Sequence, residues 1–448
     1  MKFTFGVSPL QQYLVELPGG RLQAFDVAWD SRPPTKGGQR WFSLNPHSKP
    51  GPAALAQWAT IDQNWNSMCA DCHSTNVRKN YDSSGRTYDT TYAEVDVGCE
   101  ACHGPGSAHI AWAKLPSDRR ARDPSHGLTV SFDQRIGIGW TFDSESNEVR
   151  RSRAPSNDRE VETCARCHSR RTEIHEDYVH GQSLGDDYRV AMLDDGLYFP
   201  DGQIEGEVYE YGSFVQSRMF HEGVTCSDCH DPHSLRLRAE GNSLCTRCHI
   251  AARYDSPRHH FHATGSAGAR CIDCHMPART YMLIDRRHDH SFRVPRPDLS
   301  IALGTPNTCN DCHSDKDPSW AEAQIRKWYS KRSEGFQRFG SALFAGRRGA
   351  PGAGTTLTQL ALDSAQPAIA RATALAALAD LSQQVRPEVL ARSSKEKSEV
   401  IRRGAADMLA SANPEESPAI ARLLNDRPFC KNRGGCFARR CGGSRPTS

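Results

Sequence analysis

The sequence of 448 residues has few apolar side chains and no long apolar run. Hydrophobic residues make up 37% of it, and its mean hydropathy is −0.65. No run approaches the roughly 18 to 20 apolar residues of a membrane span. The N-terminal stretch also lacks the apolar core, roughly 7–15 residues long, of a secretory signal. The chain also has no large excess of positive or negative charge, since 56 basic and 53 acidic side chains leave a net charge of +3. The composition therefore predicts no nucleic-acid partner and no transmembrane segment.

The chain nevertheless does not have the composition of a disordered protein. It contains 8 Trp, 12 Tyr and 16 Phe, and such aromatic residues are scarce in disordered segments. Its length predicts two or three domains. Something other than aliphatic side chains must fill their interior. The chain has 17 Cys and 19 His, most of them between residues 69 and 313.

The cysteines follow one repeated pattern. Fourteen of them form seven C-x-x-C pairs, and each pair is followed directly by His. Numbered in chain order as motifs 1 to 7, these are Cys69, Cys72 and His73; Cys99, Cys102 and His103; Cys164, Cys167 and His168; Cys226, Cys229 and His230; Cys245, Cys248 and His249; Cys271, Cys274 and His275; and Cys309, Cys312 and His313.

Three kinds of site use such cysteine pairs: zinc ribbons, redox dithiols and c-type haem attachment. The histidine after each pair decides between these sites. The probability that His follows all seven cysteine pairs by chance is on the order of 10⁻¹⁰. A zinc ribbon does not need it and disulfides would not impose the spacing, whereas haem c needs two thiols for its vinyl groups and an adjacent imidazole for its iron. The sequence therefore predicts seven covalent haems c, with the fourteen motif cysteines as anchors and the seven motif histidines as proximal iron ligands. The haem faces would replace the missing aliphatic core.

Twelve other histidines can supply a second axial ligand, whereas the chain has only 7 Met. Bis-His ligation keeps haem potentials lower than Met/His ligation. A Gly-Pro-Gly turn after motif 2 would direct His109 toward a neighbouring haem, and the cluster His259-His260-x-His262 precedes motif 6. The candidate distal ligands are His109, His180, His221, His233, His262 and His290. Arginines that would pair with buried haem propionates include Arg166, Arg170, Arg171 and Arg247.

The rest of the sequence predicts a mainly α fold with extensive loops, in five parts. Residues 1–60 read as a small β-containing segment packed on the haem domain, 61–335 as the heptahaem domain, and 336–356 as a linker. Asp317-Pro318 predicts a helix N-terminus. Residues 357–427 are rich in Ala and Leu, and aligning Ile369 with Ile401 suggests HEAT- or tetratricopeptide-like repeats suited to protein docking, with an ordinary helical bundle as the alternative. Residues 428–448 read as a disordered or artefactual tail, in which Cys430, Cys436 and Cys441 lack the haem spacing.

At this point the motifs resemble a known group. The stretch VTCSDCHDPHSLRLRAEGNSLCTRCH, residues 224–249, resembles the doubled C-x-x-C-H module of multihaem cytochromes c. CADCHSTNVRKNYD and VGCEACHGPGSAH resemble cytochrome c-552/4-like proteins, which are related to cytochrome c-554. The resemblance covers about residues 1–380 and implies bis-His haems in stacked pairs and electron transfer in the periplasm or elsewhere outside the cytoplasm. Members of that group usually carry a signal peptide and one more haem motif upstream, so we expect this chain to be truncated at its N-terminus.

The favoured function is electron relay between redox partner proteins, with no catalytic residues. The alternative is a multihaem oxidoreductase, with one five-coordinate haem acting on a small nitrogen or sulfur compound. It would use acid–base groups such as His259, His260 or Tyr254. The C-x-x-C-K motif that often marks such a haem in nitrite reductases is absent. A third hypothesis is a binding scaffold whose haems serve sensing.

Overall fold

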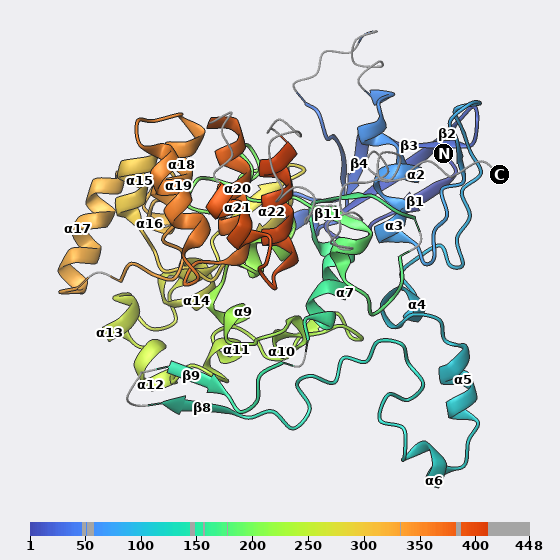
Figure 1. The fold of residues 1–448 in the computed structure, drawn as a ribbon, viewed down its shortest axis with the longest axis horizontal. Coiled ribbons are helices and arrows are strands. Elements are labelled where there is room, and N and C mark those ends of the chain that lie inside the picture. Colours follow the sequence, from blue (N-terminus) through green and yellow to red (C-terminus); the bar gives the residue numbers. More distant parts are fainter. Residues whose placement is uncertain are drawn as a thin grey trace. The chain divides into compact units, whose positions relative to one another are not determined.

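The computed structural model of the protein describes residues 1–46, 51, 58–143, 148–155, 157–176, 178–331, 333–381 and 387–410. The chain forms two compact units (Figure 1). Unit 1 comprises residues 1–131, 179–181 and 279–287, and unit 2 comprises 132–178, 182–278 and the chain from 288 onward. The span predicted as one heptahaem domain, 61–335, is therefore divided between them. Motifs 1 and 2 lie in unit 1, and motifs 3 to 7 lie in unit 2.

Unit 1 begins with a five-stranded antiparallel sheet, which confirms the predicted β-containing segment. Its strands are β1 (Phe3–Phe5), β2 (Leu10–Leu17), β3 (Arg21–Ala24), β4 (Val27–Asp30) and β5 (Arg40–Ser43). The order is β1-β2-β4-β5, with β3 pairing β2. Alternate residues of β2, including Leu10 and Leu14, are buried, as expected for a strand with one face against a core.

The sheet core leads directly to motif 1. Leu14 and Leu22 pack with Trp65, which begins the helix α2 (Trp65–Met68) just before Cys69. The Leu22 N–H donates to Asn66 Oδ1 at 2.8 Å. The sheet therefore fixes the chain at the point where motif 1 begins. The other elements of unit 1 are η1 (Pro34–Lys36), η2 (Ile61–Gln63), α3 (Ala70–His73), β6 (Tyr81–Asp82), β7 (Thr87–Tyr88), α4 (Cys99–His103), α5 (Ser107–Ala113) and α6 (Ser117–Arg120).

Unit 2 alternates short helices with two-stranded sheets in its haem-motif part. Its elements there are β8 (Trp140–Asp143), β9 (Glu148–Arg151), α7 (Arg159–His168), β10 (Arg171–Glu173), η3 (Leu184–Asp186), β11 (Tyr188–Val190), α8 (Tyr211–Phe214), α9 (Arg218–His221), α10 (Cys226–Cys229), β12 (His230–Asp231), β13 (Arg236–Leu237), α11 (Ser243–Thr246), α12 (Ala251–Tyr254), α13 (Pro257–His260), η4 (Ala267–Ala269), α14 (Cys271–His275), α15 (Pro297–Leu303) and α16 (Thr308–Cys312). A further hairpin, β14 (Ala278–Tyr281) with β15 (Asp285–His288), has its tip in unit 1. The fold is therefore mixed rather than mainly α, because antiparallel hairpins close many of the loops between the motif helices.

Longer helices follow motif 7. They are α17 (Pro318–Trp328), α18 (Gly340–Arg347), α19 (Ala353–Leu362), α20 (Ala368–Leu381), α21 (Pro387–Ser393) and α22 (Glu399–Ala410). The predicted start of α17 is confirmed, since the Asp317 carboxylate accepts from the Trp320 N–H at 2.8 Å. Helix α18 lies inside the span predicted as a linker, where the buried side chains of Phe339 and Leu343 hold it in the fold.

The helices α20 and α22 pack closely against each other. Ile369 and Ile401, the positions aligned in the sequence, are both buried in them. Gly404 of α22 permits the contact, because a Cβ there would lie 2.6 Å from the Ala372 carbonyl oxygen. The predicted tail, 428–448, lies outside the described residues. None of the helices in the described ranges combines the length and apolar character of a membrane span.

Candidate functional site

Each motif occupies about one turn of helix. The backbone N–H of the motif histidine donates to the carbonyl of the first motif cysteine in motifs 1, 5 and 7, at 3.1, 3.0 and 2.8 Å. The same bond closes motif 4. Because residues i, i+3 and i+4 share one face of a helix, each turn presents two thiols and an imidazole on the same side. This donor set is the one that covalent haem requires.

The fourteen cysteines predicted as haem anchors are all present as thiols rather than disulfides. The second cysteines of motifs 1, 2 and 3, which are Cys72, Cys102 and Cys167, are each half-buried. In motif 1 the Cys72 N–H donates to the Cys69 carbonyl at 3.1 Å, which brings the two anchors of that motif together on one turn. In motif 2 the first cysteine, Cys99, is exposed. The thiols are thus placed for thioether formation, while haem attachment at each of them stays a prediction.

Several motif imidazoles are oriented through Nδ1. His103 Nδ1–H donates to the Val130 carbonyl at 2.8 Å, and His275 Nδ1–H donates to the Arg293 carbonyl at the same distance. His168 Nδ1 instead contacts Glu210 Oε2 at 2.8 Å. A donor bond at Nδ1 fixes the tautomer in which Nε2 carries a lone pair toward a metal.

Burial favours the neutral imidazole in four motifs. Desolvation lowers the pKa of His73, His230, His249 and His275. A histidine must be neutral at the coordinating nitrogen to bind a metal. These four side chains are therefore in the protonation state of a ligand at neutral pH.

Three motif histidines face a second histidine across a gap of nearly constant width. The ring centres of His230 and His290 are 6.4 Å apart, those of His275 and His259 are 6.1 Å apart, and those of His313 and His262 are 6.3 Å apart. Two imidazole–metal bonds of about 2.0 Å, plus about 1 Å from each nitrogen to its ring centre, give a separation of about 6 Å. The interplanar angles are 29°, 8° and 33°. The spacing fits two axial ligands of one iron in each case.

The second histidines are themselves held in place. His290 Nδ1–H donates to the His288 carbonyl at 2.9 Å, and His262 Nδ1–H donates to the His260 carbonyl at 2.5 Å. His259 lies under Tyr329, whose hydroxyl donates to the His259 carbonyl at 2.5 Å. Burial, and then the neighbouring His275, lower the pKa of His259 to about 4. All three rings are thus fixed in orientation, as ligands rather than surface groups would be.

From the sequence, His259 is considered within the histidine cluster that precedes motif 6 but ranks below its neighbour His262, which alone stands among the candidate distal ligands. The structure places both beside motif histidines, His259 opposite His275 and His262 opposite His313. Phe261 between them has φ of 55° and ends α13 in the left-handed region. This turn separates two side chains that continued helix would have placed on one face. No sequence signal identified it.

The remaining predicted ligands lie in different surroundings. His109 Nδ1–H donates to the His126 carbonyl at 2.7 Å, and its ring stacks on Trp112. His180 lies beside the helix of motif 2, with Nε2 at 3.2 Å from the Ala101 carbonyl.

Two more lie in unit 2. His221 packs edge-on against Phe336, with ring centres 4.8 Å apart, and burial lowers its pKa. His233 is exposed, and its backbone N–H donates to Asp231. Among the predicted propionate partners, Arg247 donates to the Asp228 carbonyl at 2.8 Å, and the Arg171 guanidinium lies over the Tyr188 ring.

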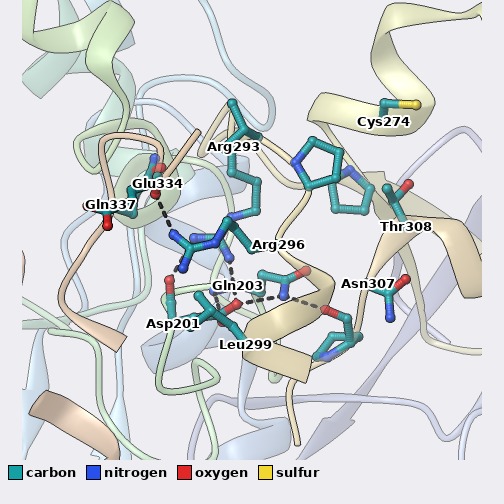
Figure 2. Close-up of a pocket in the computed structure, with 14 residues that line it drawn as sticks. Asp201, Gln203, Cys274, Arg293, Arg296, Leu299, Asn307, Thr308, Glu334 and Gln337 are labelled. Atoms are coloured by element: carbon teal, nitrogen blue, oxygen red, sulfur yellow. Dashed lines mark hydrogen bonds and ion pairs between the residues drawn. The ribbon is translucent and has the colours of Figure 1, made fainter. Parts of the chain in front are cut away.

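A polar cleft lies beside motif 6 (Figure 2). Cys274, Arg293 and Arg296 are among its lining residues. Arg293 is buried, with one nitrogen donating to the Asp201 carbonyl at 2.6 Å and another ion-paired with the Asp201 carboxylate at 3.2 Å. Its Nε is buried without a hydrogen-bond partner. A cationic group with spare donor capacity beside a haem anchor is suited to a carboxylate such as a propionate.

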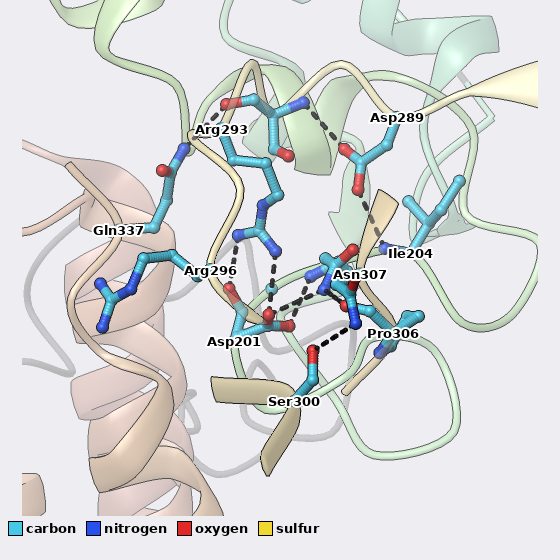
Figure 3. A network of polar contacts seen from close by, with 12 residues as sticks. Asp201, Ile204, Asp289, Arg293, Arg296, Ser300, Pro306, Asn307 and Gln337 are labelled. Atoms are coloured by element: carbon cyan, nitrogen blue, oxygen red, sulfur yellow. Dashed lines mark hydrogen bonds and ion pairs between the residues drawn. The ribbon is translucent and has the colours of Figure 1, made fainter. Parts of the chain in front are cut away.

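A buried hydrogen-bond network supports the chain segment that carries His290 (Figure 3). Asp289 accepts from the Ser291 N–H at 2.8 Å and from the Ile204 N–H at 3.2 Å. Gln337 donates to the Ser291 carbonyl at 2.7 Å. Because the segment also includes the Arg293 carbonyl that holds His275, one network positions candidate ligands of two motifs.

Repeated motif helices with oriented imidazoles are the features expected of a multihaem c-type cytochrome. Residues 35–104, which span motifs 1 and 2, match the family described as cytochrome c554 and c-prime. Residues 219–254, which span motifs 4 and 5, match the doubled CXXCH motif. Both matched stretches carry haem motifs, and in them the chain is similar to multihaem c-type cytochromes.

The chain was also compared with curated proteins and with solved structures. No curated protein matches the chain. The solved structure described as the outer cell wall cytochrome OcwA is similar over 90% of this chain and 85% of its own, with 17% identity and a TM-score of 0.47.

Proposed function

We propose that the chain attaches one haem c at each of its seven motifs and relays single electrons between redox partner proteins. The observation that carries the proposal is the set of three histidine pairs, each with one motif ring and one distal ring at 6.1–6.4 Å. A relay needs six-coordinate irons that exchange electrons without binding substrate. Paired imidazoles supply that coordination.

The pairs support a proposed set of axial ligands for three irons. His230 with His290 would hold the iron of motif 4, His275 with His259 that of motif 6, and His313 with His262 that of motif 7. His109, His180, His221 and His233 remain our proposed distal ligands for the other four irons.

The bound haem supplies one-electron redox chemistry, and the protein sets its potential and surroundings. Bis-His ligation favours low potentials. In the oxidoreductase alternative, His259 is one of three candidate acid–base groups, beside His260 and Tyr254. The His259 ring instead faces His275 at 6.1 Å, with an interplanar angle of 8°. That arrangement favours relay over catalysis.

The proposed relay also implies a location for the protein and a role for its C-terminal helices. C-type haem attachment in the resembled family takes place outside the cytoplasm, so we propose a periplasmic or other extracytoplasmic location. The helices from α19 to α22 form an apolar packed region that contains no haem motif. We propose that they are repeat-like helices available for docking a partner protein.

The test is expression with the c-type maturation machinery, followed by intact mass and optical spectra. We expect seven haems per chain, a wholly low-spin ferric spectrum unchanged by nitrite or hydroxylamine, and a ferrous spectrum unchanged by carbon monoxide. The matched control is Cys309→Ala/Cys312→Ala, which should carry six haems. A colourless, zinc-loaded product would overturn haem binding, and a native high-spin component that binds those ligands would overturn the pure relay.

A further inference from the structure

The motif helices of unit 2 are bonded to one another in chain order. Motif 4 is tied to motif 3 because the Ser227 N–H donates to Glu160 Oε1, on α7, at 2.7 Å. Motif 5 is tied to motif 4 because Arg247 Nη1 donates to the Asp228 carbonyl at 2.8 Å. Motif 7 is tied to motif 6 through the Thr308 hydroxyl, which donates to the Asp273 carbonyl. Each of these bonds joins a motif to its neighbour in the sequence.

The remaining link, between motifs 5 and 6, passes through Asn242. Its backbone carbonyl accepts from the N–H groups of Cys245 and Thr246, both at 3.0 Å, and so starts the helix of motif 5. Its side-chain Oδ1 accepts from the Cys271 N–H at 2.9 Å, and its Nδ2 donates to the Ala269 carbonyl at 2.9 Å. One residue therefore holds the first turns of two motif helices.

The links between motif helices bring anchoring cysteines of different motifs together. The side chains of Cys245 and Cys271 hydrogen-bond to each other, as do those of Cys164 and Cys226. In each case the first cysteines of two consecutive motifs are in contact. Each cysteine would carry a different haem through a thioether bond. The separation of the two sulfurs therefore sets how closely the two macrocycle edges approach.

We propose that motifs 3 to 7 form one relay in chain order and that Asn242 is the positioning residue that fixes the spacing between the haems of motifs 5 and 6. This inference rests on the proposed function, because it assumes that both motifs carry haem. Beyond that function, it gives the order of the haems along the relay. It also names a residue outside every motif, Asn242, as the one that controls the coupling between the haems of motifs 5 and 6. Electronic and magnetic coupling between two haems falls steeply with distance, so loss of Asn242 should weaken the coupling of this pair alone.

The test uses the complete haem-loaded chain and electron paramagnetic resonance of its ferric haems. The Cys245→Ala/Cys248→Ala chain, which lacks the motif 5 haem, identifies the coupled signal of this pair by its disappearance. Asn242→Ala should then lose that signal while retaining seven haems by mass and a low-spin optical spectrum.

The matched control is Asn307→Ala. Asn307 caps the helix of motif 7, accepting from the Asn310 N–H at 3.3 Å, and its side-chain amide donates to Ser300 and Asn310, neither of which belongs to another motif. Its loss should leave the motif 5–6 signal unchanged. An unchanged signal in Asn242→Ala, or the same loss in Asn307→Ala, would overturn the inference while leaving haem binding intact. A chain without haem would instead refute the proposed function.

Discussion

Replacing Asp289 by Ala should weaken both the fold and the ligation of the motif 4 iron. The side chain is 1% exposed and accepts hydrogen bonds from two buried backbone N–H groups, those of Ser291 at 2.8 Å and Ile204 at 3.2 Å. A hydrogen bond to a charged group contributes about 1.5–3 kcal/mol. With both donors left unpaired and inaccessible to water, the expected loss of unfolding free energy is about 3–6 kcal/mol.

The assay is guanidinium unfolding of the haem-loaded chain, followed by far-ultraviolet circular dichroism and by the Soret band. Covalent haem stays attached during unfolding, so loss of the cofactor does not complicate the transition. Asp289→Asn retains one acceptor oxygen and should lose about 1.5–3 kcal/mol, half of the full effect. Asp195→Ala is the surface control. Its side chain is 80% exposed and paired with Arg347, and its loss should cost about 0–1 kcal/mol.

The Asp289→Ala variant also tests the proposed ligation of the motif 4 iron. His290 lies between Asp289 and Ser291, so a loosened segment should release His290 from its position opposite His230. We expect one high-spin haem per chain that binds carbon monoxide in Asp289→Ala. An unfolding free energy within about 1 kcal/mol of the parent chain, together with a fully low-spin spectrum, would refute the reasoning.

The remaining predictions concern separate parts of unit 2. His259→Ala and His262→Ala should each convert one haem to a high-spin form that binds carbon monoxide, and the double variant should convert two; a spectrum without a high-spin component would contradict the pairing. Glu162 has a pKa raised to about 7 by burial and by the nearby carboxylates of Glu399 and Asp158. The folded chain therefore holds this proton more tightly than the unfolded chain, and stability should fall as pH rises from about 4.5 to 7. Glu162→Gln should flatten that part of the profile measured by denaturant titration, and an equally steep profile would count against the assignment. Gly404→Ala should destabilise the α20–α22 packing by about 1–3 kcal/mol, because its Cβ would meet the Ala372 carbonyl oxygen at 2.6 Å, while the haem spectrum stays unchanged; a chain as stable as the parent would show that the two helices can separate without cost.

The sequence predicted the haem anchors because their chemistry is local. Two thiols and an imidazole within five residues satisfy one cofactor, and one turn of helix is enough to present them. The start of α17 could be predicted for the same reason, since Asp317 and Pro318 act within that first turn. The N-terminal sheet followed from the alternation of residues in RLQAFDVAWD.

The distal ligands depend on long-range packing and could be predicted only as a set. His290 reaches His230 across sixty residues, and no spacing rule connects them. His259 ranked below His262 in the sequence because the left-handed turn at Phe261 has no signature there. The helix α18 was missed because the linker-like stretch GRRGAPGAG begins at its last two residues and the predicted linker was extended back over it, while its stability comes from buried Phe339 and Leu343. The order of motifs 3 to 7 in space depends on single side chains such as Asn242 and could not be predicted from motif spacing.

The most direct test of the account is a crystal structure of the haem-loaded chain. We expect seven haems, with iron between His230 and His290, between His275 and His259, and between His313 and His262. In each pair the two Nε2 atoms should lie about 4 Å apart on opposite faces of one haem. Irons at these motifs held by any other side chain, or left open on the distal face, would contradict it.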